Sequence, residues 1–379
     1  MLTSARRDLF DLPGDLAYLN AAQIGPAPTR AVQAGQAAYA AKARPWSRTI
    51  AEEFFLAPEA LRQAGARRFQ CTGDDVALAP AASYGLAVAA RNLHVAKGRD
   101  IIVLDGQFPS NVYTWRRVAE RDGATVRTLT RRDGQSWTEA LLAAIGPQTG
   151  LVACAAVHWI DGGRIDLEAV GAAARANEAG LVVDLTQSLG VMAFDAARVD
   201  PDFAVAAAYK WMLGPYASGF LYVAPRWRDG VTLEENWINR AGSEDFTRLI
   251  DYQDDYQAGA RRFDMGERSS HQIVPAALEA LTVLDEIGFA CIQAHCAEAC
   301  AALAEAAAPL GLRDDTPDRA GHYLSLTLPD DAPSDLAARL KAHGVHLSQR
   351  GPRLRVTPHI YTDAGDVARF GDALRAVLS

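Results

Sequence analysis

Short apolar segments alternate with longer helical patterns from about residue 76 to residue 224, and this alternation restricts the chain to few folds. The apolar segments are rich in Val, Ile and Leu, which is typical of strands buried on both faces. Alternating strands and helices predict a mostly parallel sheet covered by helices on both sides. We therefore expect an α/β fold with strands at 76–79, 101–104, 125–129, 151–157, 181–184, 203–207 and 219–223.

The remainder of the chain predicts a second, smaller α/β domain. Helical patterns at 84–95, 111–121, 137–145 and 167–179 separate the strands above, and residues 225–270 are less regular. One long alanine-rich helix is expected from Pro275 to about Ala308, followed by strands at 323–328, 345–348 and 354–356 and helices at 334–343 and 363–378. With 379 residues, two domains are expected. We place an N-terminal arm packing on the small domain at 1–15, a large domain at 16–260 and the small domain at 261–379.

Charge and cysteine content exclude several classes of protein. The net charge is −8, and no basic stripe accompanies it, so nucleic acid is not an expected partner. No segment has the apolar length of a membrane span, and no secretory signal is recognisable. The five cysteines form no CxxC pair and predict neither a disulfide framework nor a metal site. A cytoplasmic protein without a metal is expected.

Lys210 is the most unusual charged residue of the chain. Only four of the 38 basic residues are lysines, and this one lies among small and aromatic residues between Phe203 and Val223. Burial lowers the pKa of an amine, and an amine that loses its proton near neutral pH can form a Schiff base with a carbonyl compound. Alone, the segment is equally compatible with a lysine that extends from a buried strand to water.

Asp184 ends a predicted strand, and Lys210 follows the next strand, 26 positions further along (210 − 184). Both should lie at the carboxyl edge of the sheet, where such folds bind ligands. An aspartate that keeps a heteroaromatic nitrogen protonated makes the ring a better electron sink, and with a Schiff-base lysine it meets the needs of pyridoxal phosphate. The small residues before Ser83 lead from a strand into a helix whose first N–H groups form an anion site, unless Ser83 is an ordinary N-cap.

At this point the sequence resembles a known family, the class V aminotransferases, which are pyridoxal-phosphate enzymes that include cysteine desulfurases and kynureninase. The resemblance spans nearly the whole chain and rests on seven motifs in order. They are Tyr18-Leu-Asn-Ala-Ala-Gln-Ile-Gly-Pro26, Pro80-Ala-Ala-Ser-Tyr-Gly85, Gln107-Phe-Pro-Ser-Asn111, Val183-Asp-Leu-Thr-Gln187, Ala208-Tyr-Lys-Trp-Met-Leu-Gly-Pro215 with Gly219-Phe-Leu-Tyr-Val223, Arg262-Phe-Asp-Met-Gly266 and Leu354-Arg-Val-Thr-Pro-His359. The resemblance implies the fold type I architecture and a homodimer with active sites at the interface.

The resemblance also implies roles for individual residues around the cofactor. Lys210 would form the Schiff base and move the Cα proton, and Asp184 would pair with the pyridine nitrogen. The remaining cofactor contacts would come from Ala82 and Ser83 at the phosphate, Tyr209 beside them, Gln187 near the phenolic oxygen and Phe108 stacked on the ring. Phenylalanine at that stacking position carries no proton, so it excludes acid–base help from there.

For the substrate, the resemblance implies that Arg355 binds the α-carboxylate, since a guanidinium grips a carboxylate with two hydrogen bonds. Further substrate-binding candidates are Arg350, His158, Asn20 and Gln23. Many relatives have a threonine after the Arg262–Gly266 motif that reaches the partner subunit's phosphate. Here Arg268 or Ser269 is assigned that contact, because Glu267 would repel a phosphate.

The sequence reduces the number of possible reaction types but does not select one. Cysteine desulfurases carry a nucleophilic cysteine shortly before the carboxylate-binding arginine, whereas residues 348–355 contain none. Transamination of an amino acid is the first prediction. A carbon–sulfur or carbon–carbon β-lyase is the alternative, suggested by the kynureninase-like Tyr209 and Phe108, and a racemase or a non-catalytic effector domain ranks lower. The substrate side chain, the amino acceptor and the pathway are not predicted.

Overall fold

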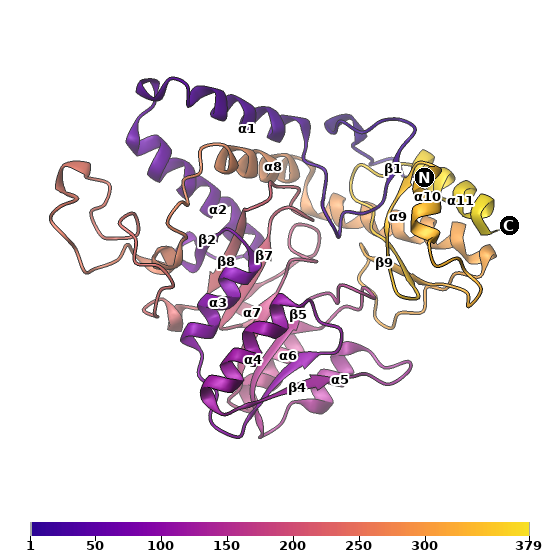
Figure 1. The fold of residues 1–379 in the computed structure, drawn as a ribbon, viewed down its shortest axis with the longest axis horizontal. Helices are drawn as coiled ribbons and strands as arrows, with labels where there is room; N and C mark the ends of the chain where they lie inside the picture. Colours follow the sequence, from indigo (N-terminus) through magenta and orange to yellow (C-terminus); the bar gives the residue numbers. More distant parts are fainter. Residues whose placement is uncertain (1, 379) are drawn as a thin grey trace.

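The computed structural model describes residues 2–378 and contains a central seven-stranded sheet (Figure 1). The sheet order is β2-β8-β7-β6-β5-β3-β4. All neighbouring strands are parallel except β8, which is antiparallel to both β2 and β7. This confirms the expected α/β fold with a mostly parallel sheet. The strands are β2 (Val76–Ala79), β3 (Asp100–Leu104), β4 (Thr125–Leu129), β5 (Thr149–Ala155), β6 (Gly180–Asp184), β7 (Phe203–Ala207) and β8 (Gly219–Val223).

Helices cover both faces of this sheet because its side chains alternate between two apolar cores. Val76 and Leu78 of β2 enter one core, while Ala77 and Ala79 of the same strand enter the other. One face packs against α3 (Ala82–Asn92) and α4 (Ser110–Asp122). The opposite face packs against α2 (Ala57–Phe69), α5 (Trp137–Ala144), α6 (Leu167–Ala176) and α7 (Ala196–Val199).

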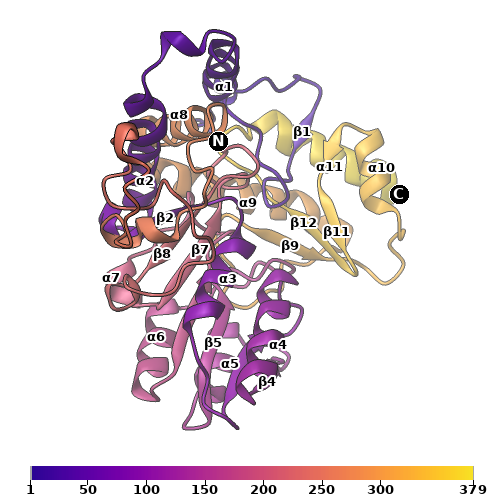
Figure 2. The same ribbon diagram turned by 60° about the vertical axis from the view of Figure 1, so that its left-hand side comes forward.

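A smaller lobe forms a third core beside the large sheet (Figure 2). Its antiparallel sheet has the order β11-β12-β9, from β9 (Leu324–Thr327), β11 (Ser348–Arg350) and β12 (Arg353–Val356). A separate parallel pair joins β1 (Ala17–Tyr18) to β10 (Val345–His346). The single strand expected at 345–348 is therefore two short strands that pair with different partners. The helices of this lobe are α9 (Phe289–Ala307), α10 (Leu336–Ala342) and α11 (Ala364–Leu378).

The long helix predicted from Pro275 to Ala308 is wrong in one respect, since two helices occupy this region. α8 (Ile273–Ile287) ends at Gly288, whose φ of +88° is a conformation that glycine adopts readily, and α9 begins directly afterwards. α8 packs against α2 and against α1 (Thr29–Ala41), whereas α9 packs against α11. We therefore propose that the large and small domains meet at Gly288 rather than between residues 260 and 261.

The N-terminal arm is tied to the small lobe by ionic and backbone contacts. Arg7 forms a 2.8 Å ion pair with Asp366 of α11, and the Arg6 amide donates to the carbonyl oxygen of Ile360. Within the described residues, no helix is both long and apolar enough to cross a membrane.

Three histidines are buried where the lobes meet, and they predict acid sensitivity. Burial lowers the pKa of His322 and of His359 to about 4 and also lowers the pKa of His295. A histidine whose folded pKa lies below its unfolded value stabilises the fold fully above about pH 6.5, and that stability is lost as pH falls toward 4. Each of the two stronger shifts corresponds to about 3 kcal/mol.

We expect the free energy of unfolding, measured in urea, to fall steeply between pH 6.5 and 4.5. A His322→Gln/His359→Gln double variant should be less stable at pH 7.5 but show a flatter pH dependence. An unchanged pH slope in the double variant would contradict this account of the two histidines.

Candidate active site

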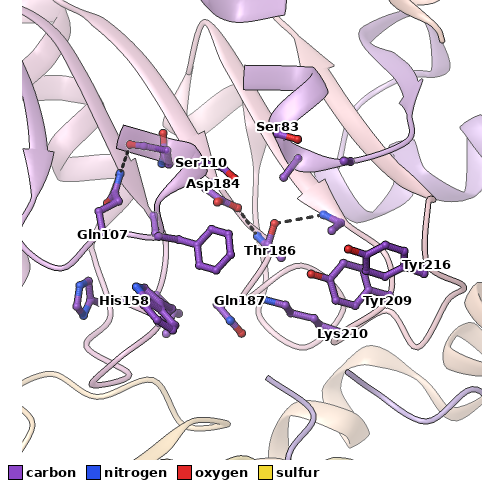
Figure 3. Close-up of a pocket in the computed structure, with 18 of the residues that line it drawn as sticks. Ser83, Gln107, Ser110, His158, Asp184, Thr186, Gln187, Tyr209, Lys210 and Tyr216 are labelled. Carbon is purple, nitrogen blue, oxygen red and sulfur yellow. Dashed lines mark hydrogen bonds between the residues drawn. The ribbon is translucent and has the colours of Figure 1, made fainter. Parts of the chain in front are cut away.

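A cavity of about 280 Å³ lies at the carboxyl ends of the parallel strands, where the sequence places Lys210 and Asp184 (Figure 3). Both residues line it, together with Ala82 and Ser83 from the start of α3 and Phe108 from the loop after β3. The crossover connections of a parallel sheet bring these distant segments to one edge. The two chemically most informative residues of the sequence therefore share one cavity.

Lys210 lies three residues beyond β7, in a loop held by close backbone contacts. The Gly25 amide donates to the carbonyl oxygen of Tyr209 at 2.9 Å. A Cβ atom at position 25 would lie 2.2 Å from the Lys210 carbonyl oxygen, so only glycine fits there. The Lys210 side chain is 7% exposed, and its Nζ lies 5.5 Å from the ring centre of Phe108 and 5.7 Å from that of Tyr209.

This environment makes the Lys210 amine unusually easy to deprotonate. Burial lowers its pKa to about 8; the nearby Asp184 carboxylate partly opposes this effect, and the Arg355 guanidinium adds to it. A substantial share of the amine is then neutral near physiological pH, as a nucleophile toward a carbonyl compound requires.

Asp184 is the last residue of β6, and the next turn fixes its carboxylate. Its Oδ1 accepts a hydrogen bond from the Thr186 amide at 2.9 Å, and the Thr186 hydroxyl accepts one from the Ala207 amide at 3.2 Å. The two bonds join the ends of β6 and β7, which carry Asp184 and Lys210. Thr186 was not singled out from sequence, although its place two residues after a strand-ending aspartate is a usable signal.

The first backbone N–H groups of α3 are free to bind an anion. Its N-cap is Ala81, which has no side chain able to cap the helix, and Ser83 lies inside the first turn rather than at the cap. Among the described residues, no hydrogen bond uses the amide of Ala82 or Ser83 as donor. Two free N–H groups at the positive end of a helix dipole suit a phosphate. These residues fit the phosphate end of the cofactor that Lys210 and Asp184 suggest.

Gln187 is held from two sides at the base of the cavity. Its Nε2 donates to the Ala22 carbonyl at 3.1 Å, and its Oε1 accepts from the Trp211 indole at 2.9 Å. Trp211 directly follows Lys210, so the loop that carries Lys210 also positions the Gln187 side chain. One N–H of the Gln187 amide has no partner in these contacts and can serve an oxygen in the cavity.

Arg355 differs from the other fully buried arginines. In the described part of the chain, Arg62 and Arg268 are buried beside Asp264 and form ion pairs of 2.6 Å with it. Arg355 is 2% exposed; it donates to the Ser348 hydroxyl and the Trp159 carbonyl, both at 2.9 Å, and also interacts with the Tyr323 hydroxyl, and no carboxylate pairs with it in the described chain. A buried guanidinium without a carboxylate is costly, so an incoming carboxylate would supply the missing charge.

His158 lines the cavity, but chain groups face both of its ring nitrogens. Nε2 lies 3.0 Å from the Asp105 carbonyl oxygen, and Nδ1 lies 3.2 Å from Asp161 Oδ1. Asp161 is in turn held by Arg131 at 2.6 Å. These contacts do not support the predicted binding of substrate by His158.

Six of the predicted site residues lie outside the cavity lining: Arg355, Arg350, Asn20, Gln23, Arg268 and Ser269. The side-chain amide of Asn20 donates to Gln23 Oε1 at 3.0 Å, within the N-terminal segment that also contains Gly25. Arg268 and Ser269 are both buried within the chain, and Arg268 is committed to Asp264. Their predicted contact to a phosphate on a partner subunit is therefore not supported by this arrangement.

Tyr216 was missed by sequence reasoning. It lines the cavity, and its ring centre lies 4.7 Å from that of Tyr209. It occupies the loop between the lysine and β8, where neither charge nor periodicity distinguishes it. Among residues 2–378, no group of three or more His, Cys, Asp or Glu side chains is arranged to hold a metal ion.

A buried lysine with a lowered pKa, a fixed aspartate and an uncapped helix start around one cavity are the features that pyridoxal phosphate chemistry needs. Residues 17–371 match the family model described as aminotransferase class-V, and the chain belongs to this family.

Curated relatives with several activities are similar to this chain. An uncharacterized aminotransferase, YcbU of Bacillus subtilis, is 26% identical over 92% of this chain and 90% of its own length. Kynureninase of Deinococcus radiodurans is 30% identical over 69% of this chain and 64% of its own length. Isopenicillin N epimerase of Streptomyces clavuligerus is 27% identical over 80% and 81%.

Solved structures show the same fold. C-DES, in a lysine-to-alanine variant with glycine covalently linked to the pyridoxal-phosphate cofactor, has a TM-score of 0.87 at 19% identity and covers 97% of this chain and 98% of its own. Apo cysteine desulfurase from Thermococcus onnurineus has a TM-score of 0.82 at 19% identity, with coverage of 98% and 97%. The protein is thus an enzyme that uses pyridoxal 5′-phosphate.

Proposed function

We propose that this enzyme transaminates an amino acid, with Lys210 as the base and Arg355 as the carboxylate anchor. The observation that carries the proposal is the buried Arg355 guanidinium without a carboxylate, near a lysine amine of pKa about 8. The charge of Arg355 lowers the pKa of Lys210, so the two groups are near enough to interact electrostatically. A bound α-carboxylate would neutralise that charge and hold the Cα–H bond within reach of Nζ.

Bound pyridoxal phosphate would supply an electron sink for the Cα bond, and the residues of the chain would control where the proton goes. Lys210 is the cavity amine that titrates near neutral pH, whereas Phe108 carries no proton and both nitrogens of His158 face other groups. One base on one side suits proton transfer between two carbons on that side, as transamination needs. Racemisation is better served by two acid–base groups on opposite sides.

A β-lyase is the second candidate, because Tyr209 and Phe108 both line the cavity and the chain is similar to kynureninase. None of the five cysteines lines the cavity, and all five are unpaired. This arrangement supports neither a persulfide-forming cysteine nor a disulfide framework. We also propose a reducing, cytoplasmic location on the evidence of the unpaired cysteines.

The reaction is tested by product analysis of the cofactor-loaded enzyme with a panel of amino acids. Transamination predicts a single equivalent of keto acid per bound cofactor, and continuous turnover only when a second keto acid is added. Continuous release of ammonia with pyruvate or alanine, without any added keto acid, would replace transamination with the lyase.

We further propose a homodimer built on the apolar groove between α1 and α8. Tyr39 and Val32 of α1 are exposed there by 63% and 44%, and Leu213 and Pro215 of the Lys210 loop line the same groove. A second copy covering this groove would shield apolar side chains and reach the active-site loop. Sedimentation of the wild type should give a dimer, whereas a monomer at micromolar concentration would contradict this assignment.

A further inference from the structure

Two arginines without carboxylate partners lie on one face of the small sheet. The β11–β12 register pairs Ser348 with Arg355 and Arg350 with Arg353. Paired residues, and residues two apart, share a face of a sheet, so all four side chains lie on the same side. This side is turned toward the large domain, since Ser325, which pairs with Arg355, donates to the Ile160 carbonyl at 3.0 Å.

The three arginines of this face have different partners. Arg353 lies 3.3 Å from a carboxylate oxygen of Asp315 and donates to the Thr316 hydroxyl at 3.1 Å. Arg350 donates only to the Gln349 carbonyl at 2.8 Å. Among the ion pairs of residues 2–378, none includes Arg350 or Arg355. Asp315 thus supplies a carboxylate to Arg353 on this face, whereas no carboxylate of the described chain pairs with Arg350.

Both uncompensated guanidinium groups flank the same cavity-lining ring. The guanidinium carbon lies 5.7 Å from the ring centre of Trp159 for Arg350 and 5.5 Å for Arg355. Partial burial lowers the pKa of Arg350, and the charge of Arg355 lowers it further. Two like charges held near one ring are unfavourable until anions bind beside them.

We propose that Arg350 forms a second carboxylate subsite, so that the substrate is an amino acid whose side chain carries a carboxylate. This inference rests on the proposed function, in which Arg355 holds the α-carboxylate. Trp159 then borders both subsites, because the two guanidinium carbons lie 5.7 and 5.5 Å from its ring centre. A dicarboxylate spanning them would neutralise both charges, whereas a monocarboxylate would leave Arg350 unpaired.

The test uses unreactive ligands, so its outcome does not depend on the reaction. Dicarboxylates from succinate to adipate and monocarboxylates of equal length are titrated into the cofactor-loaded enzyme by calorimetry. We expect at least one dicarboxylate to bind about tenfold more tightly than its monocarboxylate match. Arg350→Gln should remove that preference and change monocarboxylate binding much less than dicarboxylate binding, while Arg353→Gln, the matched control on the same face, should retain the preference.

Equal binding of dicarboxylates and monocarboxylates across the wild-type series would overturn the subsite. An unchanged preference for dicarboxylates in Arg350→Gln would also overturn it, because Arg350 would then only cover the Trp159 ring. Failure of the proposed function has a different signature. Monocarboxylate binding that is unaffected by Arg355→Gln would remove the α-carboxylate anchor itself, whatever Arg350 does.

Discussion

Replacement of Lys210 by alanine is expected to reduce turnover by at least about 10⁴-fold, because one residue supplies both the nucleophile and the base. The amine is buried, has a pKa of about 8, and lies between the rings of Phe108 and Tyr209. No other amine lines the cavity in the described chain, so no neighbouring side chain can replace it. The measurement is kcat with the best amino acid of the panel, for wild type and variant saturated with cofactor.

The variant should still bind pyridoxal phosphate without a covalent link, since the free amides at the start of α3 and the carboxylate of Asp184 remain. Lys97→Ala is the matched control, because Lys97 is exposed and distant from the cavity lining. Partial recovery of the Lys210→Ala variant by small external amines would support the role as base. A Lys210→Ala enzyme with wild-type turnover would remove this residue from the chemistry.

Replacement of Arg355 by glutamine is expected to raise KM for the amino acid by about 100-fold or more, with a smaller change in kcat. Truncating one member of a desolvated, charge-assisted pair costs about 2 to 5 kcal/mol, and substrate would lose its bidentate anchor. Arg355→Lys should recover little of this loss, because an ammonium group cannot form the planar pair. Steady-state kinetics on all variants measure the effect.

The same substitution removes hydrogen bonds to Ser348 and to the Trp159 carbonyl, so folding must be measured beside kinetics. Arg353→Gln controls for the loss of a cation from the same sheet face. A KM within about twofold of wild type in a folded Arg355→Gln enzyme would exclude the arginine from the substrate site.

The sheet was predictable from sequence because all of its strands except the exposed edge strand β4 are buried on both faces. Each of the seven predicted strands matches an observed strand to within two residues, as at Phe203–Ala207. The break at Gly288 was not predicted, since a single glycine in an alanine-rich pattern does not reveal its positive φ. Likewise, the change of pairing partner between β10 and β11 was not predicted, because β10 pairs with β1, which is far away in sequence.

Sequence predicted those cavity residues that lie at or just after the carboxyl end of a strand. Lys210 and Asp184 follow strands of one parallel sheet, so topology brings them together. The partners of Arg268 and His158 are only four and three residues away, at Asp264 and Asp161, but both segments are turns, so sequence spacing did not predict the pairings. The missing partner of Arg350 was equally hidden, since the sequence shows a charge but not its neighbours.

The most direct test of the account is to locate the cofactor on the chain. Purified protein is incubated with pyridoxal phosphate, reduced with borohydride, digested and analysed by peptide mass spectrometry. The account predicts one modified lysine, Lys210, with loss of the label in Lys210→Ala. Labelling of Lys42, Lys97 or Lys341 in place of Lys210, or no specific label, would contradict the active site described above.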